Sequence, residues 1–220
     1  MTGKRGGFFI CFTGIDGTGK TTLAKLLVTS LREKGIDAHY VYARLVPRIS
    51  KPVMTIGRFL FLRNKDISKN YTEYLHSKKR LLRCQIVSKI YTLILLCDYI
   101  IQVILKIKIP LMFGKNIVCD RYIYDTIITD IAIDMNYSEE YILDLLKKCF
   151  LLIPEPDFVF LIDAPEEIAY SRKDDVPSIE YLKARRQIYL KIGKKCCMFV
   201  LDGTKNIKEL LSELESEVFP

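Results

Sequence analysis

The run GIDGTGKT at residues 14–21 is the feature that most limits what this chain can fold into, because it matches the pattern GxxxxGK[ST] in full. In that pattern the glycines let backbone N–H groups close around phosphate oxygens, and the following helix offers its positive end. Such a turn needs a strand before it and a helix after it. The apolar run at 7–13 and the helically spaced segment 20–34, ended by Gly35, supply both. The motif therefore predicts a P-loop that binds a nucleoside triphosphate.

The side chains of this motif have separate tasks in such a site. Lys20 is expected to reach the β and γ phosphate oxygens, and Thr21 is expected to ligate Mg²⁺. We therefore expect ATP and Mg²⁺ as cofactors. The residues expected to hold the donor nucleotide from this turn are Gly14, Asp16, Gly17, Thr18, Gly19, Lys20, Thr21 and Thr22.

The rest of the chain alternates apolar strands with amphipathic helices. Runs at 38–43, 116–120, 157–163 and 196–202 predict four more strands. Helices are expected at 122–133, 138–150 and 207–218, and segment 52–106 is expected to be mostly helical with breaks around 64–70. The chain has 220 residues, half of them apolar, which is enough for one domain and short for two. This pattern predicts a single α/β domain spanning residues 1–220, a three-layer fold with a five-stranded parallel sheet between helices.

The composition bounds the partners and the compartment. The net charge of +8 would suit a polyanion, but the basic residues are scattered, with short clusters at 78–83 and 183–186, so nucleic acid is not the expected partner. Seven cysteines, an odd number without a CxxC pair, and no apolar signal segment before Gly14 favour the reducing cytoplasm. The apolar stretch 90–105 is interrupted by Asp98 and is shorter than the roughly 20 residues of a bilayer span, so we expect a buried or interface helix rather than a membrane span.

Polar residues follow two of the predicted strands. Asp120 ends the apolar run 116–120, where a Walker-B-type carboxylate would hold or orient Mg²⁺ or its water. Arg121 follows it and is suited to bridge the charges of donor and acceptor phosphates. Arg44 comes after the second strand. Ligands of open parallel sheets bind at the carboxyl ends of the strands, where Gly14, Arg44 and Asp120 all fall.

Together these motifs resemble the thymidylate kinase family. The resemblance rests on FTGIDGTGKTT at 12–22, Arg44, DRY at 120–122, PDF at 156–158 leading to LID at 161–163, Arg172, and LDGT at 201–204. The matches recur in order over nearly the whole chain. The resemblance implies transfer of the ATP γ-phosphoryl group to dTMP, a lid at about 164–180, and a homodimer through the 90–105 helix.

Roles of single residues follow from the same resemblance. It implies that Asp16 meets a sugar hydroxyl of the acceptor, that Arg44 and Arg121 grip its phosphate, and that the turn with Gly203 borders adenine. The P-loop has no cation besides Lys20, so the charge on the transferring phosphoryl group must be met by the lid, where Arg172 and Lys173 sit. The expected catalytic residues are Lys20, Asp120, Arg121 and Arg172, and Arg172 is also expected to bind the donor.

The chain departs from the family pattern where the acceptor base is expected. The family usually has Asp-Arg where this chain has Asp98-Tyr99, and Tyr99 could stack on a base but brings no cation. A family serine becomes Asp125, and the family's Ala-Tyr-Gln becomes residues 128–130. The family usually has an acidic residue just before the first glycine of the P-loop, and this chain has Thr13 there. A kinase for another small phosphorylated or hydroxylated acceptor, or an ATP-binding regulatory protein, therefore stays open; a GTPase is disfavoured because no NKxD signature is present.

Overall fold

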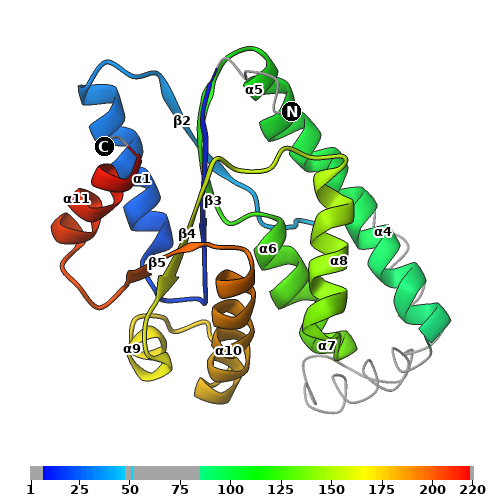
Figure 1. Ribbon diagram of the computed structural model, residues 1–220. Coiled ribbons are helices and arrows are strands. Elements are labelled where there is room, and N and C mark those ends of the chain that lie inside the picture. The colour runs from blue at the N-terminus through cyan, green and yellow to red at the C-terminus, as the bar shows by residue number, and fades with distance from the viewer. Residues whose placement is uncertain (1–6, 48–50, 52–84, 219–220) are drawn as a thin grey trace.

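Five parallel strands form one sheet in the order β2-β3-β1-β4-β5 (Figure 1). Residues 7–47, 51 and 85–218 are described by the structure, which is a computed structural model. The strands are β1 (Phe9–Thr13), β2 (Ala38–Tyr42), β3 (Asn116–Asp120), β4 (Phe158–Asp163) and β5 (Phe199–Asp202). In the register, Phe12 lies opposite Asp120 and Thr13 lies opposite Leu161. The parallel α/β sheet expected from the sequence is thus confirmed.

Helices connect the strands along the described chain. They are α1 (Lys20–Glu33), α4 (Gln85–Val103), η1 (Ile104–Lys108), α5 (Ile109–Met112), α6 (Ile123–Asp125), η2 (Thr126–Ala132), α7 (Ile133–Met135), α8 (Glu139–Phe150), α9 (Glu166–Ser171), α10 (Ile179–Lys195) and α11 (Ile207–Val218). The elements η1 and η2 have π-helical hydrogen bonding, which is frequent at functional sites.

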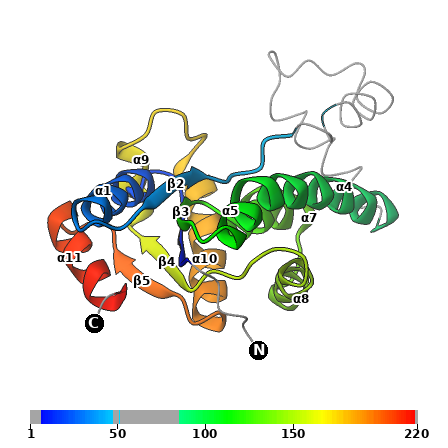
Figure 2. The ribbon, with the colours of Figure 1, turned by 90° about the horizontal axis from the view of Figure 1, so that it is seen from above.

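The alternation of side chains along β1 builds two separate cores. Phe9 and Cys11 point into a core with α4, η2, α8 and α10, whereas Ile10 and Phe12 point into a core with α1 and α11. Both faces of the central strands β1 and β3 are therefore buried, as their uninterrupted apolar runs require. Figure 1 shows α1 and α11 on one side of the sheet and α4, α8 and α10 on the other, and Figure 2 shows the same separation from above.

The long apolar helix lies along the edge of the core that contains Phe9 and Cys11. Its inner side contributes Leu95, Tyr99 and Val103 at a spacing of four residues, all almost completely buried. Within the described residues, one helical stretch, Ser88–Met112, has 25 residues and the length and composition of a membrane-crossing helix. The apolar stretch predicted at 90–105 was therefore too short. Because one side of it packs into the core, the stretch fits the expected buried helix, and its other side is exposed.

The element boundaries test the sequence predictions directly. β3 and α11 have the predicted bounds, and β1, β2, β4 and β5 lie within the predicted runs. Three helices, α5, α9 and α10, were not predicted. Helix α10 begins after Ser178, whose hydroxyl accepts from the Tyr181 amide at 3.2 Å, so an ordinary N-cap starts it. The breaks predicted around 64–70 lie outside the described residues.

Candidate active site

The P-loop turn between β1 and α1 is packed against neighbouring backbone at two glycines. Gly17 has a φ of +86°, and a Cβ added there would lie 2.0 Å from the Ala169 carbonyl oxygen of α9. Gly14 has a φ of +135°, and its Cβ would lie 2.5 Å from the Ile162 carbonyl oxygen. Both positions therefore require glycine for the backbone angle and for the close approach. The turn is held from within by Thr18, which is buried and donates to the Ile15 carbonyl oxygen at 3.1 Å.

Lys20, the first residue of α1, has its ammonium group buried inside the turn. Its Nζ donates to the Ile15 carbonyl oxygen and to Thr18 Oγ1, the latter at 3.3 Å. Burial, together with the charge of Arg121, lowers the pKa of Lys20 to about 7, although nearby carboxylates oppose the change. The N-cap residue Gly19 has no side chain to cap the helix, and the first turn contains no acidic residue. Open N–H groups and a desolvated ammonium make this helix end suited to an anion.

Asp120 joins the end of β3 to the start of α1. Its Oδ2 accepts from Thr21 Oγ1 at 2.6 Å and from the hydroxyl of Tyr40 on β2 at 2.9 Å. Its Oδ1 is buried and has no hydrogen-bond partner among the described residues. A buried carboxylate oxygen of this kind needs a cation or a donor that a ligand would bring.

The hydroxyl of Thr21 and the carboxylate of Asp120 fit a magnesium ion, both in their oxygen chemistry and in the number of ligands that the protein supplies. No group of three or more His, Cys, Asp or Glu that could hold a metal occurs in the described part of the chain. Mg²⁺ prefers oxygen ligands and usually keeps several waters, with one or two carboxylates and substrate phosphates completing its shell. The hydroxyl of Thr21 and the open Oδ1 of Asp120 are ligands of this type.

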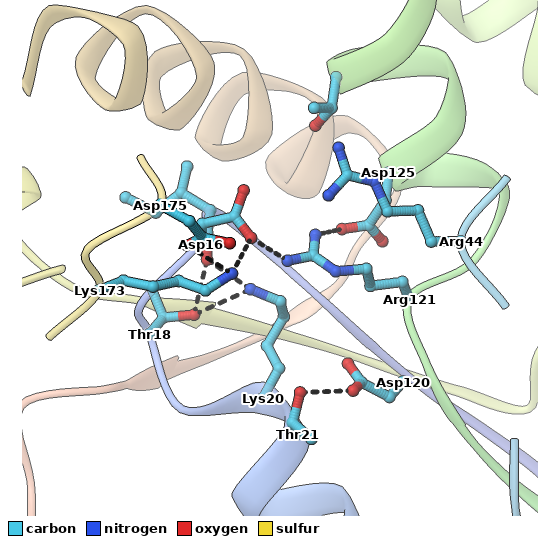
Figure 3. A network of polar contacts seen from close by, with 12 residues as sticks. Asp16, Thr18, Lys20, Thr21, Arg44, Asp120, Arg121, Asp125, Lys173 and Asp175 are labelled. Carbon is cyan, nitrogen blue, oxygen red and sulfur yellow. Dashed lines mark hydrogen bonds and ion pairs between the residues drawn. The ribbon is translucent and has the colours of Figure 1, made fainter. Parts of the chain in front are cut away.

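Arg121 lies at the centre of a buried group of charges (Figure 3). Its guanidinium donates to Asp16 of the P-loop and to Asp125 Oδ1, the latter at 3.0 Å. Burial alone would lower the pKa of Arg121, but the two carboxylates outweigh it and raise the pKa. Its φ of +68° is unusual for a residue with a side chain, which costs about 1–3 kcal/mol and occurs mainly at functional sites. The neighbouring Asp16 has its pKa lowered, because Arg121, Lys20 and Lys173 outweigh the effect of burial.

Arg44 follows β2 and lies beside Arg121 (Figure 3). Its Nη2 is 3.3 Å from Oδ1 of Asp130 in η2. The other carboxylate oxygen of Asp130 is buried without a hydrogen-bond partner among the described residues, and burial raises the pKa of Asp130 despite the charge of Arg44. Guanidinium groups from two neighbouring strand ends are thus close enough for their charges to interact, an arrangement that matches the oxygens of a phosphate.

The segment after β4 brings one cationic side chain to the P-loop and another to the turn after β5. Lys173 Nζ lies 3.5 Å from Asp16 Oδ1 and 3.2 Å from Asp175 Oδ1, so this ammonium is next to the P-loop. Arg172 Nη1 instead donates to the Gly203 carbonyl oxygen at 2.9 Å. Gly203 follows β5, and a Cβ on it would lie 3.0 Å from the Thr18 carbonyl oxygen. Arg172 therefore lies at the turn after β5, and Lys173 is the closer of the two to Asp16.

The structure brings most of the predicted site residues to one edge of the sheet. Side chains of the P-loop, of the ends of β2 and β3 and of the segment after β4 meet there (Figure 3). Thr22 lies exposed on α1, next to this group in sequence. The ligand-binding roles of all the predicted site residues remain predictions.

Comparison with known proteins tests the family to which this arrangement belongs. A sequence model described as thymidylate kinase matches residues 63–214, more than half of the chain. The chain belongs to the thymidylate kinase family. A probable thymidylate kinase of Sulfurisphaera tokodaii is 30% identical and aligns over 92% of this chain and 90% of its own length. A probable thymidylate kinase of Methanocaldococcus jannaschii is 30% identical over 94% and 93%, and the thymidylate kinase of Plasmodium falciparum is 25% identical over 98% and 91%.

Tyr99, which the sequence analysis expects to bind the substrate, lies in the hydrophobic core. Its ring is 1% exposed and lies in the core, with its centroid 6.4 Å from that of Tyr122. Its hydroxyl donates to the Ala43 carbonyl oxygen at 3.0 Å. Stacking on a base would require the ring to leave this packing. In this structure Tyr99 supports the backbone just before Arg44, and its contact with a base stays a prediction.

Several residues that shape the site of this thymidylate kinase family member were missed by the sequence analysis. Tyr40 donates to Asp120, and Tyr189 of α10 donates to Asp125 at 2.9 Å. Arg186 of α10 binds both oxygens of Asp163, at 2.7 and 2.9 Å, and thereby joins α10 to the end of β4. Their partners lie 23 to 80 residues away along the chain. No spacing or motif could have indicated these pairs, because only the fold brings them together.

Proposed function

We propose that this chain is a dTMP kinase that transfers the γ-phosphoryl group of ATP to dTMP and gives dTDP and ADP. The observation that carries the proposal is the meeting of Lys20 and the Thr21–Asp120 pair with Arg44 and Arg121 at one sheet edge of a thymidylate kinase fold. The first group is suited to a triphosphate and its metal, and the second to the phosphate of an acceptor.

The donor side would be formed by the P-loop turn. Backbone N–H groups at the start of α1 and the ammonium of Lys20 would bind the β and γ phosphate oxygens. Thr21 and Asp120 would hold Mg²⁺, whose chemistry is to neutralise charge on the β and γ phosphate oxygens. Lys20 now donates to the Ile15 carbonyl oxygen, so phosphate oxygens would replace that acceptor.

The acceptor side would be formed by the guanidinium groups of Arg44 and Arg121. Both would grip the phosphate of dTMP, while the carboxylate of Asp16 accepts a hydrogen bond from a sugar hydroxyl. An oxygen of that phosphate attacks the γ phosphorus, the bond to the β–γ bridging oxygen breaks, and ADP leaves with that oxygen. Holding the two phosphates in line is the principal contribution of these side chains to the rate.

The lid would supply the remaining positive charge. Arg172 and Lys173 are both candidates to stabilise the transferring phosphoryl group. The contact of Lys173 with Asp16 favours Lys173 for that role. The contact of Arg172 with the Gly203 carbonyl oxygen favours binding of ATP near the turn expected to border adenine.

A related candidate is a kinase of the same fold for another nucleoside monophosphate. The open Oδ2 of Asp130 beside Arg44, and the core position of Tyr99, both favour an acceptor base other than thymine. A carboxylate oxygen accepts hydrogen bonds, so it would suit a base with an exocyclic amino group, which cytosine, adenine and guanine have and thymine lacks.

Release of ADP, measured with a coupled assay, distinguishes these candidates. Purified chain with MgATP would be offered dTMP, dUMP, dCMP, dAMP, dGMP and the matching ribonucleotides at equal concentrations. The proposal predicts the highest kcat/KM for dTMP. A preference of tenfold or more for another base would replace dTMP by that acceptor, and no turnover with any of them would reject the proposal.

Two finer expectations belong to the same proposal. We expect a homodimer in the cytoplasm, formed through the outer side of α4 and η1. Apolar side chains on that side are exposed at helical spacing: Ile90, Leu93, Ile101 and Leu105 are 53%, 62%, 44% and 62% exposed. Sedimentation at micromolar concentration should give a dimer for the native chain and a monomer for Leu93→Glu; a native monomer would reject this interface.

A further inference from the structure

Asp125 is a buried carboxylate that accepts four hydrogen bonds. Its side chain is 1% exposed. Oδ1 accepts from Arg121 Nη1 at 3.0 Å and from the Tyr189 hydroxyl at 2.9 Å. Oδ2 accepts from Thr13 Oγ1 at 2.9 Å and from the Tyr122 amide at 3.1 Å. A carboxylate has about four acceptor positions, so this carboxylate is fully used by donors of the protein itself.

The donors fix Asp125 from three elements. Thr13 ends β1, Tyr122 precedes α6, and Tyr189 belongs to α10. All the hydrogen-bonded side chains except Arg121 are at most 1% exposed. The carboxylate therefore has little freedom to move, which makes it a fixed point against which another side chain can be aimed.

Arg121 is held between this fixed carboxylate and the P-loop. Nη1 is bound by Asp125, while the other terminal nitrogen, Nη2, is bound by Asp16. Under the proposed function Asp16 takes a hydrogen bond from the sugar of the acceptor, and Arg121 takes its phosphate. The bond to Asp16 must then be shared with the substrate, whereas the bond to Asp125 lies in the core and remains.

We propose that Asp125 is a positioning residue that orients the guanidinium of Arg121 toward the acceptor phosphate. This inference rests on the proposed function, because it assigns Arg121 to a phosphate. Asp125 does not touch the substrate; it acts through Nη1 of Arg121 and leaves Nη2 directed at the P-loop side (Figure 3).

Kinetics of Asp125→Asn test the proposal. The amide keeps the shape but removes the charge and turns one acceptor into a donor, so its NH₂ group must face either Arg121 or the Tyr122 amide, both of which are donors. We expect kcat/KM for the acceptor to fall by about 100-fold, as for a misplaced binding group, with KM for ATP changed less than threefold. The matched control is Asp157→Asn, which changes a carboxylate that accepts from the Phe9 amide at 2.7 Å at the opposite end of the sheet. Equal kinetics for Asp125→Asn and native enzyme would overturn the proposal.

A double variant that moves the carboxylate to residue 13 distinguishes a positioning role of Asp125 from a role in packing alone. Thr13 Oγ1 lies 2.9 Å from Asp125 Oδ2, so Thr13→Glu combined with Asp125→Ser returns a carboxylate to the same space. The kcat/KM of the double variant for the acceptor should be at least tenfold higher than that of Asp125→Ser alone. A double variant that regains the native Tm but none of the lost kcat/KM would make the role of Asp125 structural only.

A measurement on the native chain keeps the inference testable if the variants do not fold. Nitrogen-15 NMR should show separate Nη1 and Nη2 signals for Arg121 without any nucleotide, because a guanidinium held at both ends rotates slowly. A single averaged signal would overturn the proposal. This experiment needs no turnover, so absence of dTMP phosphorylation would reject the proposed function without deciding the role of Asp125.

Discussion

Thr21 and Asp120 are 99 residues apart in the sequence and share a 2.6 Å hydrogen bond between Oγ1 and Oδ2. This bond ties the first turn of α1 to the end of β3. The second oxygen of Asp120 has no hydrogen-bond partner among the described residues, and under the proposed function this pair of side chains would hold Mg²⁺. The pair thus connects the P-loop to the strand that also presents Arg121.

Substitutions at these two positions should separate metal binding from packing. Thr21→Val keeps the shape of the side chain and removes the hydroxyl, whereas Thr21→Ser keeps the hydroxyl. We expect Thr21→Val and Asp120→Asn to lower activity at limiting Mg²⁺ by about 10–100-fold, with partial recovery at high Mg²⁺. Thr21→Ser should stay within threefold of the native enzyme. Equal Mg²⁺ titration curves for all four proteins would argue against this metal site.

Lys20→Met should abolish turnover without loss of stability. The substitution removes the phosphate-binding charge, and we expect kcat to fall by at least about 10²–10³-fold. Burial lowers the pKa of Lys20 to about 7, so the charged ammonium is less favourable in the folded chain than in the unfolded chain, and its removal should not reduce stability. Thermal unfolding should give a Tm within about 4 °C of the native value, which corresponds to about 1 kcal/mol for a chain of this length. Native turnover in the variant would contradict the P-loop assignment.

Under the proposed function, Arg172 and Lys173 should differ in the kinetic constant that each controls. Lys173→Met removes the ammonium next to Asp16, and we expect it mainly to lower kcat. Arg172→Met removes the contact with Gly203, and we expect it mainly to raise KM for ATP. Steady-state kinetics with both substrates varied would measure each constant. The reverse assignment, a kcat effect at Arg172 alone, would restore Arg172 as the catalytic cation of the lid.

Asp16 should make a pH-dependent contribution to stability. Its pKa is lowered from the ordinary value of 3.8 in the folded chain, so the unfolded chain binds more protons in that range and stability rises with pH. The contribution is fully present above pH 3.8 and is lost as the pH falls through the lowered pKa. Asp16→Asn should therefore destabilise the protein by about 1–3 kcal/mol at pH 7, and the difference should shrink below pH 4.

Urea unfolding from pH 3 to pH 7 measures this contribution. The exposed Asp174 of the same region provides a control, since Asp174→Asn should give the native curve at every pH. A difference between native and Asp16→Asn that does not change between pH 3 and pH 7 would exclude the ion pair with Arg121 as its source.

The sequence predicted the sheet well because its strands are unbroken apolar runs and its turns carry strong motifs. The P-loop, Asp120 and Arg121 were found by motif and position, and they meet as expected. Helix α10 was missed because its outer side is rich in lysine and arginine, so its few buried positions, such as Leu182 and Tyr189, form a weak apolar pattern.

The predictions were weakest for residues whose place depends on distant partners. Tyr99 has the aromatic ring that a base contact would need, but its core packing depends on Tyr122 and Ala43. Thr13 and Asp125 appeared as two separate departures from the family pattern. They are hydrogen-bonded to each other across 112 residues of sequence, and only the fold reveals that pairing.

Transfer of labelled phosphate in a single turnover tests the central claim most directly. Enzyme in excess would be mixed with ATP labelled at the γ phosphorus, Mg²⁺ and dTMP, and the products separated. The account predicts that the label appears in the β phosphate of dTDP, in a one-to-one ratio with ADP, and only when dTMP is present. Label found in inorganic phosphate, or remaining in ATP while dTMP is present, would contradict it.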